Sequence, residues 1–446
     1  MNVSLLNYWD WLLAPLYIFI TVVIASGIKD RYIKKNPIYK YFLSGLIVKI
    51  IGAISVCLVY AYYYKTGGDT LSYYSSAIAF VNLLFQSPVD FLHVWFSAPT
   101  RGNYFFFNAN TGFPFFYNQQ YELTVVKLIV PLELVAFKSY ITSSVLMAAV
   151  SYTGVWKLYQ MFCEIYPSLY KKFAIAILFI PSVVFWGSGI LKDSWTLAGA
   201  GWFCFSFYRI FINRKNIIFN ILCILISSFI LISIKPYIFI ALLPGCLVLG
   251  TWNQILSIKN LFLKFLFIPF ILSAGIGGGI FVWGIVSAGL GQYSSVDSMI
   301  KKAVDSSEDL KQEYYHGNSF DIGSYDPSLS GMMSKFPIAV FTGLFRPFLW
   351  ESKNIVMILS GIENLITLFF AFYVFLRKPI SNLRNLFSKP IVLFSLIFAI
   401  FFSFSVAIST SNFGALVRLR IPQIPFLLSG LVILNFWKEE KKINKT

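Results

Sequence analysis

Long apolar segments separated by short polar ones follow one another along most of the chain. A helix that crosses a membrane needs about 17 to 25 mainly apolar residues, and segments of this kind recur about eleven times. The predicted spans are 11–27, 42–63, 141–161, 173–189, 194–212, 217–234, 236–252, 265–288, 354–376, 389–408 and 421–437. The pattern therefore predicts an all-α, polytopic membrane protein with a single transmembrane domain over residues 1–446.

The composition narrows the class further. Hydrophobic residues make up 57% of the chain and charged residues only 12%, whereas a soluble domain carries roughly 25% charged residues. These proportions exclude a secreted disulfide scaffold, a coiled coil and a disordered tail. The five cysteines lie in or beside apolar segments without metal-site spacing, and His93 and His316 are isolated. We therefore assign no metal and no cofactor, and a divalent metal requirement has no support.

Basic residues set the predicted orientation. The chain has 36 Lys and Arg against 19 Asp and Glu, a net charge of +17. They concentrate in 28–41, 209–216, 377–389 and the carboxyl-terminal tail, which all lie on the cytoplasmic side if the amino terminus is outside and the carboxyl terminus inside. This distribution predicts a multi-pass protein of the cell (inner) membrane, and it explains the positive charge without a nucleic-acid partner.

Two long segments then fall on the outer face. Residues 64–140 contain short, interrupted apolar stretches that suit helices lying in the membrane interface. Residues 290–353 begin with a charged helical pattern and continue into the turn-rich run DIGSYDPSLSG, which suits a mobile lid. Within it, 336–353 is predicted to be a re-entrant or interfacial element, because a full span would place the basic 377–389 loop outside.

Ionised side chains near a membrane are costly, so those that gather on one face are candidates for a site. Asp69 follows two glycines and opens a helical pattern, where it would cap the helix, act as a general base, or do both. Lys192 and Asp193 share a tight turn between two spans. They would form a self-satisfied ion pair, or Lys192 would bind an anionic headgroup while Asp193 orients it or a substrate hydroxyl.

Three further places complete the candidate set. Lys235 lies at the hinge of an apolar hairpin, where a lone lysine usually extends its amine to the interface. Arg346 and Glu351 flank aromatic residues, which favours a structural ion pair. Arg418 and Arg420 precede the last span on the outer face, and guanidinium groups match phosphate oxygens. They are predicted to bind a lipid-linked phosphate or pyrophosphate, or else ordinary outer-leaflet phospholipid.

Taken together, these motifs resemble those of the GT-C superfamily of integral-membrane glycosyltransferases, in the bacterial branch similar to protein mannosyltransferases and aminoarabinose transferases. The resemblance lies in the early acid Asp69, the Lys192-Asp193 turn and the run LVRLRIPQIPFLL. Members typically carry two adjacent acids where this chain has Asp69 followed by Thr70.

The resemblance implies a function at the extracytoplasmic face. A sugar would pass from a polyprenyl-phosphate donor to a lipid, glycan or protein acceptor, with inversion. Asp69 would be the general base, while Arg418, Arg420 and Lys192 would hold the phosphate leaving group.

Two other functions stay open. A polymerase or ligase acting on undecaprenyl-linked glycans would use similar cations, with an extended acceptor groove in 290–353. A transporter or flippase would show internal repeats or polar residues at the membrane midplane. Among charged residues, only Lys49 and Glu363 lie more than five residues from the end of a predicted span, which disfavours transport.

The orientation can be tested by placing single cysteines at Ser328 and Ser381 in a cysteine-free background. We expect a membrane-impermeant maleimide to label position 328 in intact cells and position 381 only after permeabilisation, because the basic 377–389 loop is predicted to be cytoplasmic. The opposite labelling pattern would invert the topology.

Overall fold

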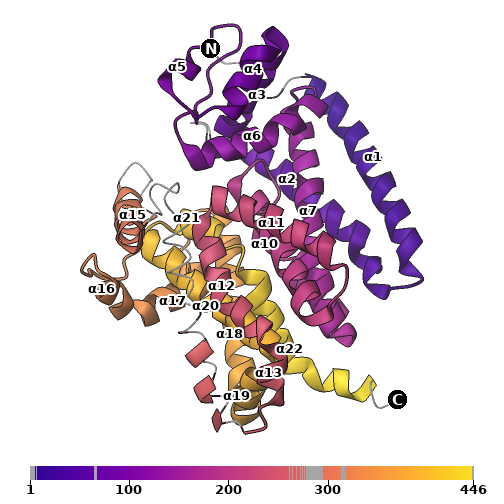
Figure 1. Ribbon diagram of the computed structural model, residues 1–446, viewed down its shortest axis with the longest axis vertical. Helices are drawn as coiled ribbons and strands as arrows, with labels where there is room; N and C mark the ends of the chain where they lie inside the picture. Colours follow the sequence, from indigo (N-terminus) through magenta and orange to yellow (C-terminus); the bar gives the residue numbers. More distant parts are fainter. Residues whose placement is uncertain are drawn as a thin grey trace. The chain divides into compact units, whose positions relative to one another are not determined.

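The computed structural model describes residues 8–64, 68–260, 295–312 and 318–443, together with Leu6 and scattered positions between 262 and 277. In this part of the chain every regular element is helical, and the only β pairing is an isolated bridge between Ser319 and Asn412 (Figure 1). The all-α prediction is confirmed. The chain forms two compact units, which are described one at a time.

The first unit comprises Met1–Gln160, Val183–Trp202 and Ile226–Lys235. Its helices are α1 (Tyr8–Ile33), α2 (Phe42–Leu58), α3 (Asp69–Gln86), α4 (Pro88–Phe96), α5 (Arg101–Tyr104) and α6 (Gln120–Val135), with most of α7 (Tyr140–Ile165) and the start of α10 (Lys192–Tyr208). A 3-10 turn (Pro37–Tyr41) precedes α2, and a π-helical turn (Val59–Tyr63) extends it.

Capping residues and prolines explain where several of these helices begin. The Asn36 side chain accepts a hydrogen bond from the Ile38 amide, and Ser87 accepts one from Asp90 at the start of α4. Pro37 and Pro88 occupy first helical positions, where the missing N–H costs nothing. The segment predicted as an outer loop therefore contains the helices α3 to α6, and α3 packs against α6 (Figure 1). Their depth in a membrane stays a prediction.

The second unit comprises Met161–Ser182, Phe203–Leu225 and Pro236–Thr446. Its helices are α8 (Tyr170–Phe173), α12 (Pro236–Gly250), α13 (Trp252–Ser257), α15 (Val296–Asp309), α16 (Leu329–Ser334), α17 (Phe336–Phe345), α18 (Ile355–Arg377), α19 (Pro379–Ser388), α20 (Pro390–Ser409), α21 (Phe413–Leu419) and α22 (Ile424–Ile443). The helices α9 (Pro181–Trp186), α10 and α11 (Ile217–Ile234) contribute residues to both units.

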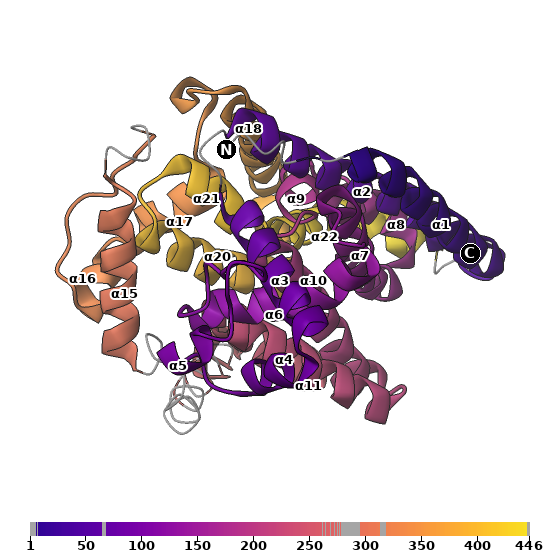
Figure 2. The ribbon, with the colours of Figure 1, turned by 90° about the horizontal axis from the view of Figure 1, so that it is seen from above.

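The centre of the second unit is α20, which packs against α12, α17 and α22 and buries most of its side chains. Figure 2 shows α17 beside α20. Glycines permit the close contacts. A Cβ atom at Gly343 of α17 would overlap the backbone of Ser403, and one at Gly245 of α12 would crowd the ring of Phe394. Small residues of this kind let apolar helices approach closely.

Among the described residues, five helices are long and apolar enough to cross a membrane: α1, α2 with its flanking turns, α11, α18 and α20. A sixth span results if α21 and α22, which meet at an angle of 65°, form one broken span. The described residues therefore have the apolar helices of a multi-pass membrane protein.

The eleven predicted spans are not confirmed. The predicted span 173–189 is interrupted, because the helix made of α8 and the π-helical turn Ala174–Leu178 ends before the non-helical residues 179–180, and α9 begins after them. Helix α12, in the predicted span 236–252, has 15 residues. At 1.5 Å per residue it extends about 22 Å, less than the roughly 30 Å of a hydrocarbon core. The predicted span 265–288 lies largely outside the described residues.

The predicted re-entrant element 336–353 contains no full span. Helix α17 has 10 residues, or about 15 Å of helix. A 3-10 turn (Leu349–Glu351) follows it before α18 begins. Length alone thus separates this segment from a crossing helix, while its position relative to a membrane stays a prediction.

Helices α7 and α10 meet backbone to backbone in the first unit. A Cβ atom at Gly154 would overlap the carbonyl oxygen of Ala198, and one at Gly201 would overlap that of Gly154. We expect Gly154→Ala to lower the free energy of unfolding by about 1–3 kcal/mol, because the contact leaves no room for a methyl group. The midpoint of thermal unfolding in detergent measures this.

Gly27 of α1 is the matched control, because a Cβ atom there would have no other atom within 4 Å. Gly27→Ala should leave the midpoint unchanged or raise it, since alanine favours a helix by about 1 kcal/mol over glycine. If both variants lowered the unfolding midpoint equally, the close contact at Gly154 would not be the cause of the loss.

Candidate functional site

Five ionisable side chains at helix ends of the first unit form what we call the ionic cluster: Asp69, Glu122, Lys192, Asp193 and Lys235. Asp69 is the first residue of α3, and Glu122 lies in the first turn of α6. Lys192 and Asp193 open α10, and Lys235 lies between α11 and α12. The three acids in first turns face the positive ends of helix dipoles, which favour a negative charge there.

Two ion pairs connect these helix ends. The Lys192 amine donates to Glu122 Oε1, and Lys235 Nζ lies 2.5 Å from Asp193 Oδ1. Lys192 thus pairs with Glu122 and not with its neighbour Asp193, so the self-satisfied pair suggested for this turn is wrong. Adjacent residues on a helix do not face each other, which explains why each of the two finds its partner on another element.

Lys235 also departs from expectation. Its side chain is only 6% exposed and that of Asp193 is 0% exposed, so the amine does not extend to an interface. An ion pair this deeply buried persists because each charge would cost several kcal/mol if it lost its partner.

Asp69 adds a third carboxylate to the ionic cluster. It interacts electrostatically with the Lys192 amine, and its side chain is half-buried. Gly68, and not Asp69, is the N-cap residue of α3. Burial lowers the pKa of the Lys192 amine, while the carboxylates of Glu122 and Asp69 oppose that shift.

The turn before α10 is held by a buried lysine from α2. Lys49 donates to the carbonyl oxygen of Gly187 and, at 3.5 Å, to the hydroxyl of Ser188. In the same turn the Ser194 hydroxyl donates to the Gly189 carbonyl at 2.7 Å. These bonds fix the backbone that presents Lys192 and Asp193.

The other predicted residues lie in the second unit. Arg346 donates from Nε and Nη2 to Glu351 Oε1, at 3.0 and 2.5 Å. Its guanidinium lies over the rings of Phe320 and Phe413, at 5.6 and 5.1 Å from their centroids. The structural Arg346–Glu351 pair is confirmed.

Arg420 is 1% exposed and binds inside the unit. Its Nη1 donates to the Arg346 carbonyl oxygen at 2.6 Å, and its Nη2 donates to Asn364 Oδ1. Asn364 in turn donates to the Pro347 carbonyl at 2.7 Å. These contacts hold the backbone at 346–347. Arg418 is half-buried at the end of α21, and phosphate binding by Arg418 and Arg420 stays a prediction.

Glu363, which is unusual inside a span, has partners. Its carboxylate accepts hydrogen bonds from the Ser182 amide at 3.0 Å and hydroxyl at 2.5 Å. It also interacts electrostatically with Arg420. Glu363 therefore anchors the start of α9 to α18 and offsets part of the buried positive charge.

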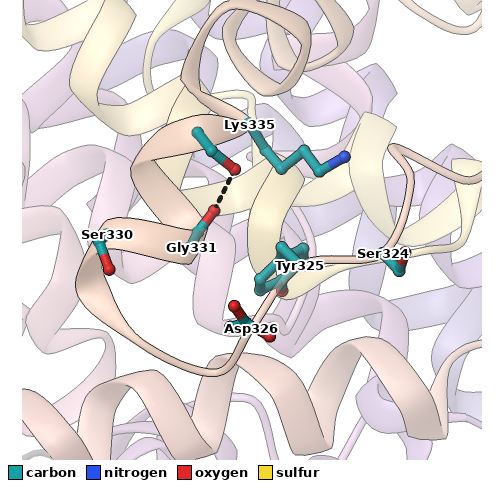
Figure 3. A pocket seen from close by; sticks show the side chains of 7 residues that line it. Ser324, Tyr325, Asp326, Ser330, Gly331 and Lys335 are labelled. Carbon is teal, nitrogen blue, oxygen red and sulfur yellow. Dashed lines mark hydrogen bonds between the residues drawn. The ribbon is translucent and has the colours of Figure 1, made fainter.

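An open pocket of about 550 Å³ lies in the second unit, where the sequence predicts a lid (Figure 3). Its lining residues are Ser324, Tyr325, Asp326, Ser330, Gly331, Ser334 and Lys335. The segment is held by the Tyr325 hydroxyl, which donates to the Ile408 carbonyl at 3.2 Å, and by Ser328, which caps α16. Hydroxyls with one acid and one amine suit a polyhydroxylated ligand.

The structure thus brings four predicted residues together, Asp69, Lys192, Asp193 and Lys235. It places Arg346, Glu351, Arg418 and Arg420 in the other unit. Sequence reasoning missed Glu122 as a member of the ionic cluster, Lys49 as the support of its turn, and Asn364. The sequence feature that could have identified Glu122 is its position as an acid near the start of a mainly apolar helical stretch in the predicted outer segment 64–140.

Comparison with protein families, curated proteins and solved structures found no match to this chain. Among the described residues, no group of three or more His, Cys, Asp or Glu side chains could hold a metal ion. A function for this chain is therefore inferred from the geometry of the ionic cluster.

The buried pair can be tested by removing one charge or both. We expect Lys235→Met to lower the free energy of unfolding by about 3–5 kcal/mol, because it leaves the Asp193 carboxylate buried without its cation. The double variant Lys235→Met, Asp193→Asn should lose much less. Chemical unfolding in detergent measures both.

The exposed pair Lys29–Asp30, 3.9 Å apart with side chains 30% and 68% exposed, supplies the control. Asp30→Asn should change stability by no more than about 0.5 kcal/mol. If the double variant proved as unstable as Lys235→Met, the loss would come from packing and not from an uncompensated charge.

Proposed function

We propose that this chain is an inverting glycosyltransferase that uses a polyprenyl-phosphate-linked sugar as its donor. The observation that carries the proposal is the ionic cluster, in which the half-buried Asp69 carboxylate interacts with the Lys192 amine at helix ends. A carboxylate base and a cation that interact electrostatically are what transfer from a phosphate-activated donor to a hydroxyl requires.

The residues divide the chemistry between them. Asp69 accepts the proton of the acceptor hydroxyl as its oxygen forms a bond to the anomeric carbon. The bond from that carbon to the phosphate oxygen breaks, and the phosphate leaves with the electron pair. A single displacement of this kind inverts the anomeric centre. Lys192 stabilises the negative charge that develops on the leaving phosphate.

Glu122, Asp193 and Lys235 hold this arrangement in place. Glu122 fixes the Lys192 amine, and the buried Asp193–Lys235 pair fixes the start of α10. Pre-positioned charges stabilise a transition state without reorganising during the reaction. Arg418 and Arg420 lie in the second unit. Phosphate binding by these two residues stays a prediction, and both terminal nitrogens of Arg420 already donate to protein acceptors of that unit.

We place the reaction at the extracytoplasmic face of the inner membrane. The predicted eleven-span topology, with the amino terminus outside, puts the starts of α3, α6 and α10 on that side. The apolar helices supply the surface along which an isoprenoid tail can lie.

A polymerase or ligase of lipid-linked glycans is the second candidate. The pocket at residues 324–335 favours it, because its hydroxyl-rich wall suits an acceptor longer than one sugar (Figure 3). The two candidates differ in the lipid-linked glycan that accumulates without the protein.

The test compares cells that lack the protein with cells that carry it or a variant, by mass analysis of lipid-linked glycans. Cells without it should accumulate a glycan short of one sugar, and the wild-type chain should restore that sugar. Asp69→Asn should reduce the restored product by about 10²-fold or more, because the general base is lost. Its level in the membrane should match the wild type.

Asp90→Asn is the matched control, since Asp90 occupies the first turn of α4 as Asp69 does that of α3. It should restore the sugar fully. Full restoration by Asp69→Asn would refute the assigned base. Single unpolymerised repeats, in place of a glycan short of one sugar, would favour the polymerase.

A further inference from the structure

A second group of polar side chains lies inside the first unit, outside the ionic cluster. Glu133, in the last turn of α6, is 0% exposed. Within the described residues, neither of its carboxylate oxygens accepts a hydrogen bond of normal geometry, and the fully buried Ser143 hydroxyl of α7 makes none either. The two side chains are nevertheless close enough for Ser143 to influence the Glu133 carboxyl. Buried polar atoms without partners are rare, and a bound ion or water is a common reason for them.

The surroundings of Glu133 are negative and rich in oxygen. Asp10 of α1 is 3% exposed and interacts electrostatically with Glu133. Asp10 Oδ1 accepts hydrogen bonds from the Ser139 hydroxyl at 2.7 Å and the Ile141 amide at 3.3 Å. The carboxyl-terminal end of α6 adds the negative end of a helix dipole.

Among the described residues, the other groups that face Glu133 supply no positive charge. Tyr74 of α3 interacts with Glu133, and its hydroxyl donates to the Lys138 carbonyl at 2.7 Å. The Lys138 amine itself donates to Asn82 at 2.6 Å. Cys57 of α2 is near both acids, and its thiol donates to the Ser144 hydroxyl at 2.9 Å.

An ionised Glu133 therefore needs a counterion. Burial, and then the charge of Asp10, raise the pKa of the Glu133 carboxyl well above its usual value, while Ser143 opposes that shift. Either a proton or a bound cation can offset the charge. Carboxylate and hydroxyl oxygens are hard ligands, which suit an alkali-metal or alkaline-earth ion better than a transition metal. With only two carboxylates, the local charge favours a monovalent ion.

We propose that Glu133, Asp10 and Ser143 form a binding site for Na⁺ between α1, α6 and α7, at which a proton competes with the ion. The site is separate from the ionic cluster and does not depend on the proposed glycosyl transfer. Bound Na⁺ would join three helices of the first unit through their side-chain oxygen atoms.

The test measures thermal unfolding of the purified full-length protein in detergent, in NaCl and in choline chloride at equal ionic strength. Na⁺ should raise the unfolding midpoint in a saturable way, by about 2–4 °C. The shift should fade as the pH falls through the pKa of Glu133, because the protonated carboxyl cannot bind the ion. Binding of radioactive Na⁺ should fade over the same pH range.

Three variants make the result specific. Glu133→Gln should abolish the Na⁺ response, and Ser143→Ala should weaken Na⁺ binding by about 10-fold and serves if Glu133→Gln does not fold. Glu308→Gln, at an exposed position of α15, should respond as the wild type does. A wild-type midpoint equal in Na⁺ and choline at every pH, or a Na⁺ response that survives in both site variants, would overturn the proposal and leave a buried water at this place.

Discussion

The buried ion pair between Lys235 and Asp193 is the constraint on which the first unit depends. Apolar contacts alone specify only weakly which helices become neighbours. A carboxylate that is 0% exposed, by contrast, must lie beside a cation. The pair fixes the start of α10 against the end of α11. Lys192 and Glu122 then connect α10 to α6, and Asp69 of α3 completes the ionic cluster. A few charges at helix ends thus determine which ends lie together.

In the second unit, both charged and uncharged polar side chains fix which helices are neighbours. Arg420 reaches the backbone of residue 346 and the amide of Asn364, while Glu363 binds the start of α9. Gln423 donates to the Gly343 carbonyl at 2.9 Å and accepts from the Ser403 hydroxyl at 2.8 Å. These bonds orient α17, α18 and α20, whose remaining contacts are apolar. Polar groups in both units therefore specify a helix arrangement that burial of apolar surface alone would leave open.

Three polar sites of different character result. The ionic cluster places a carboxylate near an amine, which suits proton transfer coupled to the departure of an anion. The pocket at residues 324–335 is open and rich in hydroxyls, which suits a sugar chain. The buried acids Asp10 and Glu133 interact with each other, and no described cation lies beside Glu133, which suits a bound ion. Each assignment follows from which charges are offset within the protein and which are not.

The sequence by itself determined the helical class, the apolar character and the ends of several helices, because Pro37, Pro88, Asn36 and Ser87 act through their own backbone neighbours. It also located Asp69, Lys192, Asp193 and Lys235 at such ends. Only the tertiary structure decided the partners: Lys192 meets Glu122, 70 positions away, and Lys235 meets Asp193, 42 positions away. The reason is that a local pattern can place a charge at a helix end, but it does not tell which distant helix end packs beside that charge. The burial of Glu133 and the breaks within predicted spans likewise follow from packing between distant segments, which local sequence does not encode.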